Sequence, residues 1–148
     1  RPAEGFLYSE QHMTTLEIYD TTLRDGTQQE GISLTAGDKL MISRLLDELG
    51  VAYVEGGWPG ANPKDDEFFK RARTELDLDI ATLVAFGSTR RASTAAAKDR
   101  QLAALVAAET KVVCIVGKSW DYHVEHALRT EQQEAISMIG DSSASQDA

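Results

Sequence analysis

The sequence is poor in cysteine, in proline and in positive charge. Its 148 residues include only three prolines and one cysteine, Cys114. A single thiol excludes an internal disulfide, so we expect a reducing, cytoplasmic setting. Lysine and arginine together number 15 against 24 aspartates and glutamates, which gives a net charge of -9. That charge argues against nucleic acid or an anionic membrane as the main partner.

Long apolar runs are also missing. No stretch approaches the ~20 apolar residues that a membrane-spanning helix needs, and no segment has the basic-then-apolar order of a secretory leader. We therefore expect neither membrane insertion nor secretion. Apolar residues nevertheless make up 42% of the chain, which is typical of a globular domain with a packed core.

The two ends of the chain carry no structural pattern. Residues 1–12 show no hydrophobic period, and Met13 stands directly before the first predicted strand. We expect residues 1–12 to be a disordered leader and residues 13–139 to form the folded part. Residues 140–148 are small and polar, which predicts a disordered tail.

Between these ends, hydrophobic patterns predict four strand–helix pairs. The predicted strands are 16–19, 51–54, 80–86 and 112–116. The predicted helices lie between the Thr35 cap and Gly50, from about residue 64 onward, at 99–108 and at 130–139. The residues predicted to face the core from the first three helices are Ile42, Leu45, Leu46 and Leu49, then Phe68, Phe69, Ala72 and Leu76, then Leu102, Leu105 and Val106.

Strict alternation of strand and helix indicates parallel strands with helical crossovers. Two architectures fit: a small open sheet, and half of a (β/α)8 barrel, since a complete barrel needs about 250 residues. Every predicted strand ends in glycine and charge, which favours the barrel because all its loops on one face build a single site. No glycine-rich phosphate motif follows the first strand, which weakens a dinucleotide-binding alternative.

The densest polar stretch, 19–28, follows the first strand. Asp20 and Asp25 offer hard oxygen ligands for a cation, and Arg24 offers a planar fork for a carboxylate or an enolate oxygen. Gly26 lets the backbone turn beneath them. The alternative is a polar loop with a surface Arg–Asp pair.

The stretch Tyr19-Asp-Thr-Thr-Leu-Arg-Asp-Gly-Thr-Gln28 resembles the signature of the DRE-TIM metallolyase superfamily, which includes isopropylmalate, homocitrate and citramalate synthases. Three further segments, 55–65, 85–91 and 117–121, resemble its citramalate synthase branch in particular. The four motifs occur in order, and the similarity runs from Leu16 to Ile139. The resemblance implies a (β/α)8 barrel, of which this chain covers the first four units.

The resemblance also implies a reaction. These enzymes condense acetyl-CoA with a 2-oxo acid, pyruvate in the citramalate branch, at a divalent metal (Mg2+, Mn2+ or Zn2+), and then hydrolyse the thioester. Asp25 matches the metal carboxylate, and Arg24 matches the arginine that stabilises developing negative charge. Gln28 matches a polar residue of the substrate pocket. Glu55 either orients Arg24 or a metal-bound water, or is a buried salt-bridge partner.

Further candidates follow the third and fourth strands. Arg90 and Lys118 could gather an anionic oxo acid and the CoA phosphates, whereas Arg91 reads as a solvated charge. His123 belongs to the fourth loop motif and could touch substrate. His126 could share a helical face with it, but we favour no metal role for the pair. Trp58 and Trp120 are expected to wall the pocket, and Cys114 to be a small core residue.

One departure from the family matters. The other two metal ligands, a His-x-His pair, and a catalytic glutamate lie on later strands that these 148 residues do not include. We therefore expect the chain alone to be inactive, and its open strand edges to favour a homo-oligomer. The alternatives are a 2-isopropylmalate synthase-like fragment and a non-catalytic half-barrel scaffold that self-associates.

Overall fold

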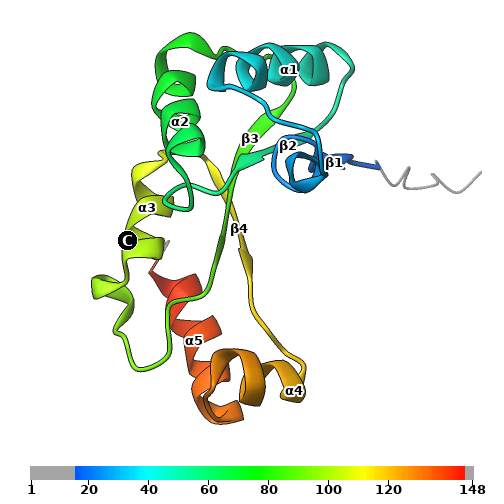
Figure 1. Ribbon diagram of the computed structural model, residues 1–148. Coiled ribbons are helices and arrows are strands. Elements are labelled where there is room, and N and C mark those ends of the chain that lie inside the picture. Colours follow the sequence, from blue (N-terminus) through cyan, green and yellow to red (C-terminus); the bar gives the residue numbers. More distant parts are fainter. Residues whose placement is uncertain (1–15, 146–148) are drawn as a thin grey trace, which may run out of the picture.

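The computed structural model describes residues 16–145 as one sheet with helices packed against it (Figure 1). The elements, in order, are β1 (Tyr19–Asp20), η1 (Gly26–Gln28), α1 (Ala36–Glu48), β2 (Tyr53–Gly57), α2 (Pro63–Glu75), β3 (Thr82–Ser88), η2 (Ala96–Lys98), α3 (Arg100–Ala107), β4 (Val112–Val116), α4 (Asp121–His123), η3 (Val124–Leu128) and α5 (Gln132–Ala144). The predicted leader lies outside the described residues. Across residues 16–145, every helix falls short of the length or hydropathy that spanning a membrane requires.

The four strands form a parallel sheet in the order β1-β2-β3-β4. Tyr19 pairs with Tyr53, Glu55 with Val84, and Phe86 with Cys114. The half-barrel prediction is confirmed: each strand lies beside the one before it, as in one half of a (β/α)8 barrel. Because all strands run the same way, their carboxyl ends share one edge of the sheet.

The strand boundaries differ from the predicted ones. β4 is as predicted, but β2 and β3 run on to Gly57 and Ser88, so Glu55 is a strand residue and not a loop residue. β1 is shorter than predicted, because only Tyr19 and Asp20 pair with β2. Leu16 and Ile18 are exposed instead of buried. The prediction ended β2 and β3 where their apolar runs end. The strands continue further because backbone pairing in a parallel sheet does not depend on side-chain polarity.

Helix α1 begins as predicted but buries a different face. Thr35 caps it, and Asp38 completes a reciprocal capping box with the Thr35 backbone. Leu45 and Leu49 are 55% and 77% exposed, so the predicted core face is wrong for these two residues. The buried residues are Ala36, Lys39, Leu40, Ser43 and Asp47. Three of these are polar and are buried because each has a hydrogen-bond partner, which a hydropathy pattern cannot show.

Helices α2 and α3 supply most of the core. Phe68, Phe69 and Ala72 are buried as predicted and cluster with Leu102 and Leu105 against the outer face of the sheet. The prediction for Val106 is wrong, since its side chain is 58% exposed. A second cluster around β2 contains Leu23, Val51, Val54 and Ala81.

The last part of the chain is more helical than predicted. A short helical turn, α4, and a π-helical segment, η3, fill the connection after β4. Helix α5 continues to Ala144, five residues beyond the predicted end at Ile139. Ser142, placed in the predicted polar tail, is fully buried and donates to the Met138 carbonyl. Its hydroxyl is satisfied inside the helix, so polar composition alone predicted disorder wrongly here.

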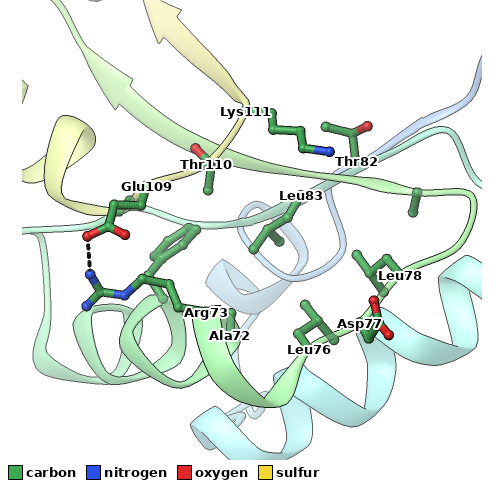
Figure 2. A pocket seen from close by; sticks show the side chains of 13 residues that line it. Ala72, Arg73, Leu76, Asp77, Leu78, Thr82, Leu83, Glu109, Thr110 and Lys111 are labelled. Atoms are coloured by element: carbon green, nitrogen blue, oxygen red, sulfur yellow. Dashed lines mark hydrogen bonds and ion pairs between the residues drawn. The ribbon is translucent and has the colours of Figure 1, made fainter.

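The amino-terminal edge of the sheet carries a cavity of about 360 Å³ (Figure 2). Thr82 and Lys111 lie at the start of β3 and just before β4, and the Arg73–Glu109 ion pair closes one side. Active sites of barrel enzymes lie at the opposite, carboxyl-terminal edge. This cavity is therefore part of the packing between helices and strands.

Asp47 fastens α1 to the segment that enters β3. Its Oδ1 accepts hydrogen bonds from the N–H groups of Ile80 and Ala81, at 2.8 and 2.6 Å, and its Oδ2 accepts one from Asp79, at 3.1 Å. The Ala81 bond lowers the pKa of Asp47, burial opposes this, and the other two bonds add to the lowering. The carboxylate is therefore bound as an anion.

We predict that Asp47→Asn lowers the free energy of unfolding by about 1–3 kcal/mol at pH 7, because the new amide NH2 would face the Asp79 N–H donor. Since the folded pKa lies below the ordinary value of 3.8, the stabilisation is complete above that value and is lost as pH falls through the folded pKa. Urea unfolding at several pH values measures this. The exposed Asp77→Asn is the matched control, and an equal loss in both variants would contradict the prediction.

Candidate active site

The loop after β1 is a tight turn that presents Arg24 and Asp25 at the carboxyl edge of the sheet. The Thr21 carbonyl accepts hydrogen bonds from the N–H groups of Arg24, Asp25 and Gly26, at 3.1, 2.8 and 3.2 Å. Leu23 points the other way and is fully buried in the second core cluster. This buried leucine anchors the turn, so the polar side chains on either side of it project from a fixed backbone.

Arg24 is the centre of the site. Its Nε donates to Glu55 Oε1 at 2.8 Å, and its Nη1 donates to Asp25 Oδ1 at 2.9 Å. Glu55 is 1% exposed. Burial alone would lower the pKa of Arg24, but the hydrogen bond and the charge of Glu55 outweigh it and raise the pKa. The guanidinium therefore stays charged, and among residues 16–145 its Nη2 group has no hydrogen-bond acceptor.

Aromatic rings fix the plane of the guanidinium. The Arg24 Cζ atom lies 3.9 Å from the centroid of the Phe86 ring, close enough for a cation–π interaction. Trp58 packs edge-on against Phe86, with 5.1 Å between ring centroids. Trp58 was expected to wall the pocket, and the structure instead places it behind the ring that supports Arg24.

Tyr19 and Cys114 complete the inner face of the sheet beside Glu55. Burial raises the pKa of the Tyr19 phenol, and interactions with the Cys114 thiol and the Glu55 carboxylate raise it further. The phenol therefore remains protonated and can donate to these groups. Cys114 is only half-buried, because it faces this polar cluster and not the helix side of the sheet.

Two predicted site residues on the first loop do not join the cluster. Asp20 turns back on its own loop, where Oδ1 accepts from the Thr22 N–H and Oδ2 from the Thr22 hydroxyl, both at 3.0 Å. Gln28 is exposed at the end of η1. Asp20 therefore shapes the loop, while Arg24, Asp25 and Glu55 contact one another.

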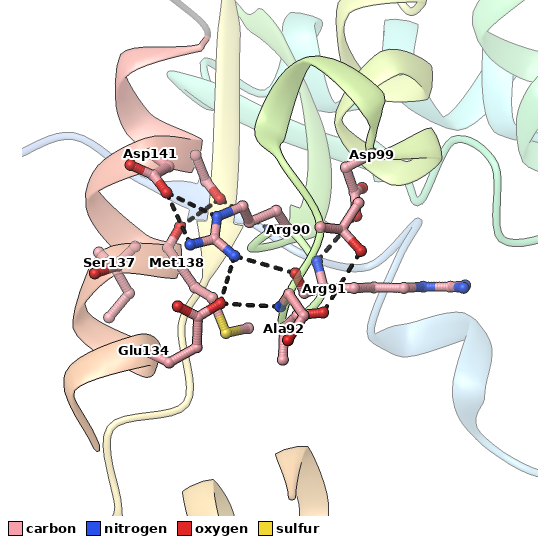
Figure 3. A network of polar contacts seen from close by, with 12 residues as sticks. Arg90, Arg91, Ala92, Asp99, Glu134, Ser137, Met138 and Asp141 are labelled. Atoms are coloured by element: carbon pink, nitrogen blue, oxygen red, sulfur yellow. Dashed lines mark hydrogen bonds and ion pairs between the residues drawn. The ribbon is translucent and has the colours of Figure 1, made fainter. Parts of the chain in front are cut away.

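Arg90, which was expected to gather the anionic oxo acid and the CoA phosphates, belongs to a network separate from Arg24 (Figure 3). Its guanidinium donates to Glu134 at 2.7 Å and to Asp141 at 2.9 Å, and its backbone N–H donates to the Ser142 hydroxyl at 2.8 Å. Only 5% of the residue is exposed. Both carboxylates lie on α5, so Arg90 clamps that helix to the end of β3. Arg91 is exposed, as predicted.

Lys118 and His123 lie on the connection between β4 and α5. Both are exposed, and His123 packs against Trp120 with 4.7 Å between ring centroids. Lys118 and Trp120 line a cavity of about 400 Å³ that Ile136 and Ile139 of α5 close from behind. Trp120 thus walls a cavity as predicted, but this cavity lies after β4, while Arg24 lies after β1.

The sequence analysis missed one polar pair that supports the site. The Lys39 ammonium, on α1, forms a buried ion pair with Asp65 and donates to the Gly56 carbonyl at 3.0 Å. Asp65 also accepts from the Trp58 N–H at 2.9 Å. The pair therefore holds the end of β2 from behind. The sequence held one signal for this pair: Lys39 lies on the same face of the predicted helix as the apolar Ala36 and Leu40.

No complete metal site is present in the described part of the chain. Within residues 16–145, no group of three or more histidine, cysteine, aspartate or glutamate side chains is placed to hold a metal ion. Asp25 nevertheless suits one ligand position: its carboxylate is 61% exposed and has Oδ1 paired with Arg24. A hard carboxylate oxygen at an open edge fits a divalent cation, whereas the exposed imidazoles of His123 and His126 are not grouped with a carboxylate ligand set.

The fold and this edge define the class of the protein. The chain belongs to the HMGL-like family, whose model matches residues 15–144. A crystal structure of the HMG-CoA lyase of Bacillus subtilis has the same fold, with a TM-score of 0.61 at 17% identity over 86% of this chain and 41% of that chain. The predicted barrel family is thereby confirmed.

Within that family, the chain is similar to the (R)-citramalate synthases. It is 57% identical over 127 residues to that of Streptomyces coelicolor, covering 86% of this chain and 24% of the relative. It is 53% identical over 131 residues to that of Synechocystis, covering 88% of this chain and 24% of the relative. The chain thus spans about a quarter of the length of these curated relatives, and the predicted family resemblance is confirmed.

The Arg24–Glu55 ion pair should contribute to the free energy of unfolding. Arg24→Met should lower the free energy of unfolding by about 3 kcal/mol, because it leaves the buried Glu55 carboxylate without a counter-charge. Adding Glu55→Gln should recover part of that loss. Chemical denaturation of the single and double variants measures both effects.

The control is a pair of the same chemistry on the surface. Arg71 donates to Glu75 at 2.8 Å, and Arg71→Met should destabilise the fold much less than Arg24→Met, because solvent screens this exposed pair. If Arg24→Met were no more destabilising than Arg71→Met, the Glu55 carboxylate would not depend on Arg24.

Proposed function

We propose that this chain supplies the Arg24–Asp25–Glu55 part of the active site of a citramalate-synthase-type acyltransferase. The observation that carries the proposal is the fixed Arg24 guanidinium, whose Nε and Nη1 are taken by Glu55 and Asp25. The identity of 57% and 53% to two (R)-citramalate synthases supports it. The substrates are pyruvate and acetyl-CoA, and the product belongs to branched-chain amino-acid synthesis.

The reaction places negative charge where Arg24 can meet it. A base takes a proton from the methyl carbon of acetyl-CoA, and that carbon forms a bond to the keto carbon of pyruvate. The keto double bond opens onto its oxygen, which carries the negative charge until it takes up a proton. Water then cleaves the thioester and frees the CoA thiol. The Nη2 donors of Arg24 are directed at that oxygen or at the pyruvate carboxylate. A donor fixed in advance by Glu55 and Phe86 reorganises little during the reaction.

Asp25 would hold the divalent cation with one carboxylate oxygen. When bound, that cation supplies positive charge that polarises the keto group of the 2-oxo acid. A single carboxylate binds such a cation weakly against water, so further ligands must come from residues beyond those grouped in this part of the barrel. Gln28, Lys118 and His123 are retained as substrate contacts in the whole site, and Arg90 is assigned to the α5 clamp.

The first test is turnover. We predict that the 148-residue polypeptide gives no measurable release of CoA thiol from acetyl-CoA and pyruvate, because it carries one of the metal ligands. Adding the rest of the barrel from a close relative should produce turnover that Asp25→Ala abolishes. Thiol release measured with a colorimetric reagent reports both.

Pyruvate and 2-oxoisovalerate distinguish the two synthase types in the same assay. Preference for 2-oxoisovalerate would indicate an isopropylmalate-type pocket and contradict the proposed substrate. Turnover by the polypeptide alone, lost in Asp25→Ala, would show that the remaining catalytic groups had been misplaced. An intact barrel without turnover on either acid would favour the non-catalytic scaffold.

We further propose that the 148-residue polypeptide self-associates through its two open sheet edges. In the described residues, β1 and β4 each pair on one side only. Helix α1, which follows β1 in the chain, exposes an apolar stripe formed by Met41, Leu45 and Leu49, at 54%, 55% and 77%. Beside β4, Ile136 and Ile139 of α5 are 62% and 40% exposed. Open edges flanked by apolar side chains favour association.

Sedimentation at micromolar concentration tests this. We expect a dimer or larger species, because two copies related by a two-fold axis could pair β1 of each with β4 of the other. Replacing Leu45 and Leu49 by glutamine should shift the distribution toward the monomer, whereas the exposed neighbour Glu48→Gln should not. A compact monomer that melts cooperatively would refute the proposal.

A further inference from the structure

Four aromatic rings form a continuous surface after β4, which we call the aromatic platform: Trp120, Tyr122, His123 and His126. Trp120 lies 5.1 Å from Tyr122 and 4.7 Å from His123, and Tyr122 stacks on His126 at 4.2 Å with 16° between the rings. Trp120 and Tyr122 are 58% and 53% exposed. Large aromatic side chains held together yet left exposed are typical of a binding surface.

The platform borders the 400 Å³ cavity, and Trp120 lines both. The cavity has apolar lining residues, Val124, Ala135, Ile136 and Ile139, and polar ones, Lys118, Ser119, Asp121 and Gln132. Lys118 forms no ion pair within residues 16–145. A cavity with exposed aromatic and apolar residues and an unpaired ammonium at its lining suits a planar ring that carries negative groups.

The backbone under the platform is unusual. The five residues of η3 form a π-helical segment, a geometry found disproportionately at functional sites. Directly after it, Arg129 adopts a left-handed conformation with φ of 54°, which costs free energy for a residue other than glycine. The surrounding contacts therefore hold this connection in a shape that the chain would not adopt locally.

The platform also lies on the edge of the sheet used by the candidate active site. Trp120 follows the carboxyl end of β4, as Arg24 follows the carboxyl end of β1, and parallel strands bring these ends to one edge. An acyl-CoA is a long molecule whose thioester and adenine lie far apart. Its adenine can therefore bind after β4 while its acyl group reaches Arg24.

We propose that the aromatic platform binds the adenine nucleotide end of an acyl-CoA, with the adenine stacked on Trp120 and Lys118 facing a phosphate. This assignment rests on the proposed function for its acyl-CoA, but it concerns residues separate from Arg24, Asp25 and Glu55. Stacking suits the ring cluster because every purine presents a flat π-face. The lysine provides the charge complement in a chain that is otherwise strongly acidic.

The test is calorimetric binding of adenosine 3′,5′-bisphosphate, the nucleotide end of CoA, to the 148-residue polypeptide. Trp120→Ala should weaken binding about tenfold or more, in line with the loss of one stacked base, and Trp120→Phe should retain most of it. Lys118→Gln should weaken binding severalfold and reduce its salt dependence. Ile80→Ala, at 60% exposed against 58% for Trp120 and at the opposite edge of the sheet, is the matched control and should leave nucleotide binding unchanged.

The outcomes separate this proposal from the proposed reaction. Nucleotide binding that depends on Trp120 would support the platform even if the completed barrel condensed nothing. Equal binding by the wild type and Trp120→Ala, or no binding by either, would overturn it, even if turnover with pyruvate were found. A Trp120→Ala variant that altered only sedimentation would identify the platform as a contact between protein chains, which also refutes the proposal.

Discussion

The buried Glu55 carboxylate is the constraint on which the site depends. A charge that is 1% exposed in the middle of a sheet is stable only if it is paired. Arg24 supplies the pair, and in doing so it draws the loop after β1 onto the end of β2. The same guanidinium lies over Phe86 of β3. One ion pair thereby joins three strands and leaves the far side of the guanidinium for chemistry.

The remaining buried charges follow the same rule, and each fastens one segment to the next. Lys39 and Asp65 hold the end of β2 between α1 and α2. Asp47 binds the entry to β3, and Asp99 caps α3 while it accepts the Arg91 N–H at 2.9 Å. Each of these links fixes which two segments come together, because a buried polar group left without its partner would carry the full cost of desolvation. Apolar side chains do not require one particular partner. The loops at the carboxyl edge are therefore ordered by polar contacts, over a core that is apolar.

The sequence predicted the strand–helix order and the parallel sheet from local periodicity, and polar residues at strand ends indicated that Arg24 and Glu55 lie at one edge of the sheet. The partner of Glu55 stayed open between Arg24 and a metal-bound water. Prediction failed where a side chain's neighbours decide its environment. Leu45 and Leu49 have helical spacing, and so do the polar residues Lys39 and Ser43 on another face of α1. The second face is the buried one, because Lys39 and Ser43 have hydrogen-bond partners inside the fold, which the sequence does not show. Arg90 had the position expected of a site residue, but its carboxylate partners lie 44 and 51 residues further along the chain.

At the carboxyl-terminal edge of the sheet, the β1 side and the β4 side are held by different interactions, which suits them to different tasks. On the β1 side, the Arg24 guanidinium is confined by a buried carboxylate and by the Phe86 ring, against which Trp58 packs edge-on, so its donors are preorganised for charge that develops during a reaction. On the β4 side, α5 buries Ala135 and Met138 and is also held by the Arg90 clamp, whose partners Glu134 and Asp141 are 31% and 54% exposed. Such pairs are weakened by salt and solvent. The β1 side can therefore hold reacting atoms in place, while the β4 side presents exposed rings and the exposed Lys118 ammonium to a bulky group that only has to be bound.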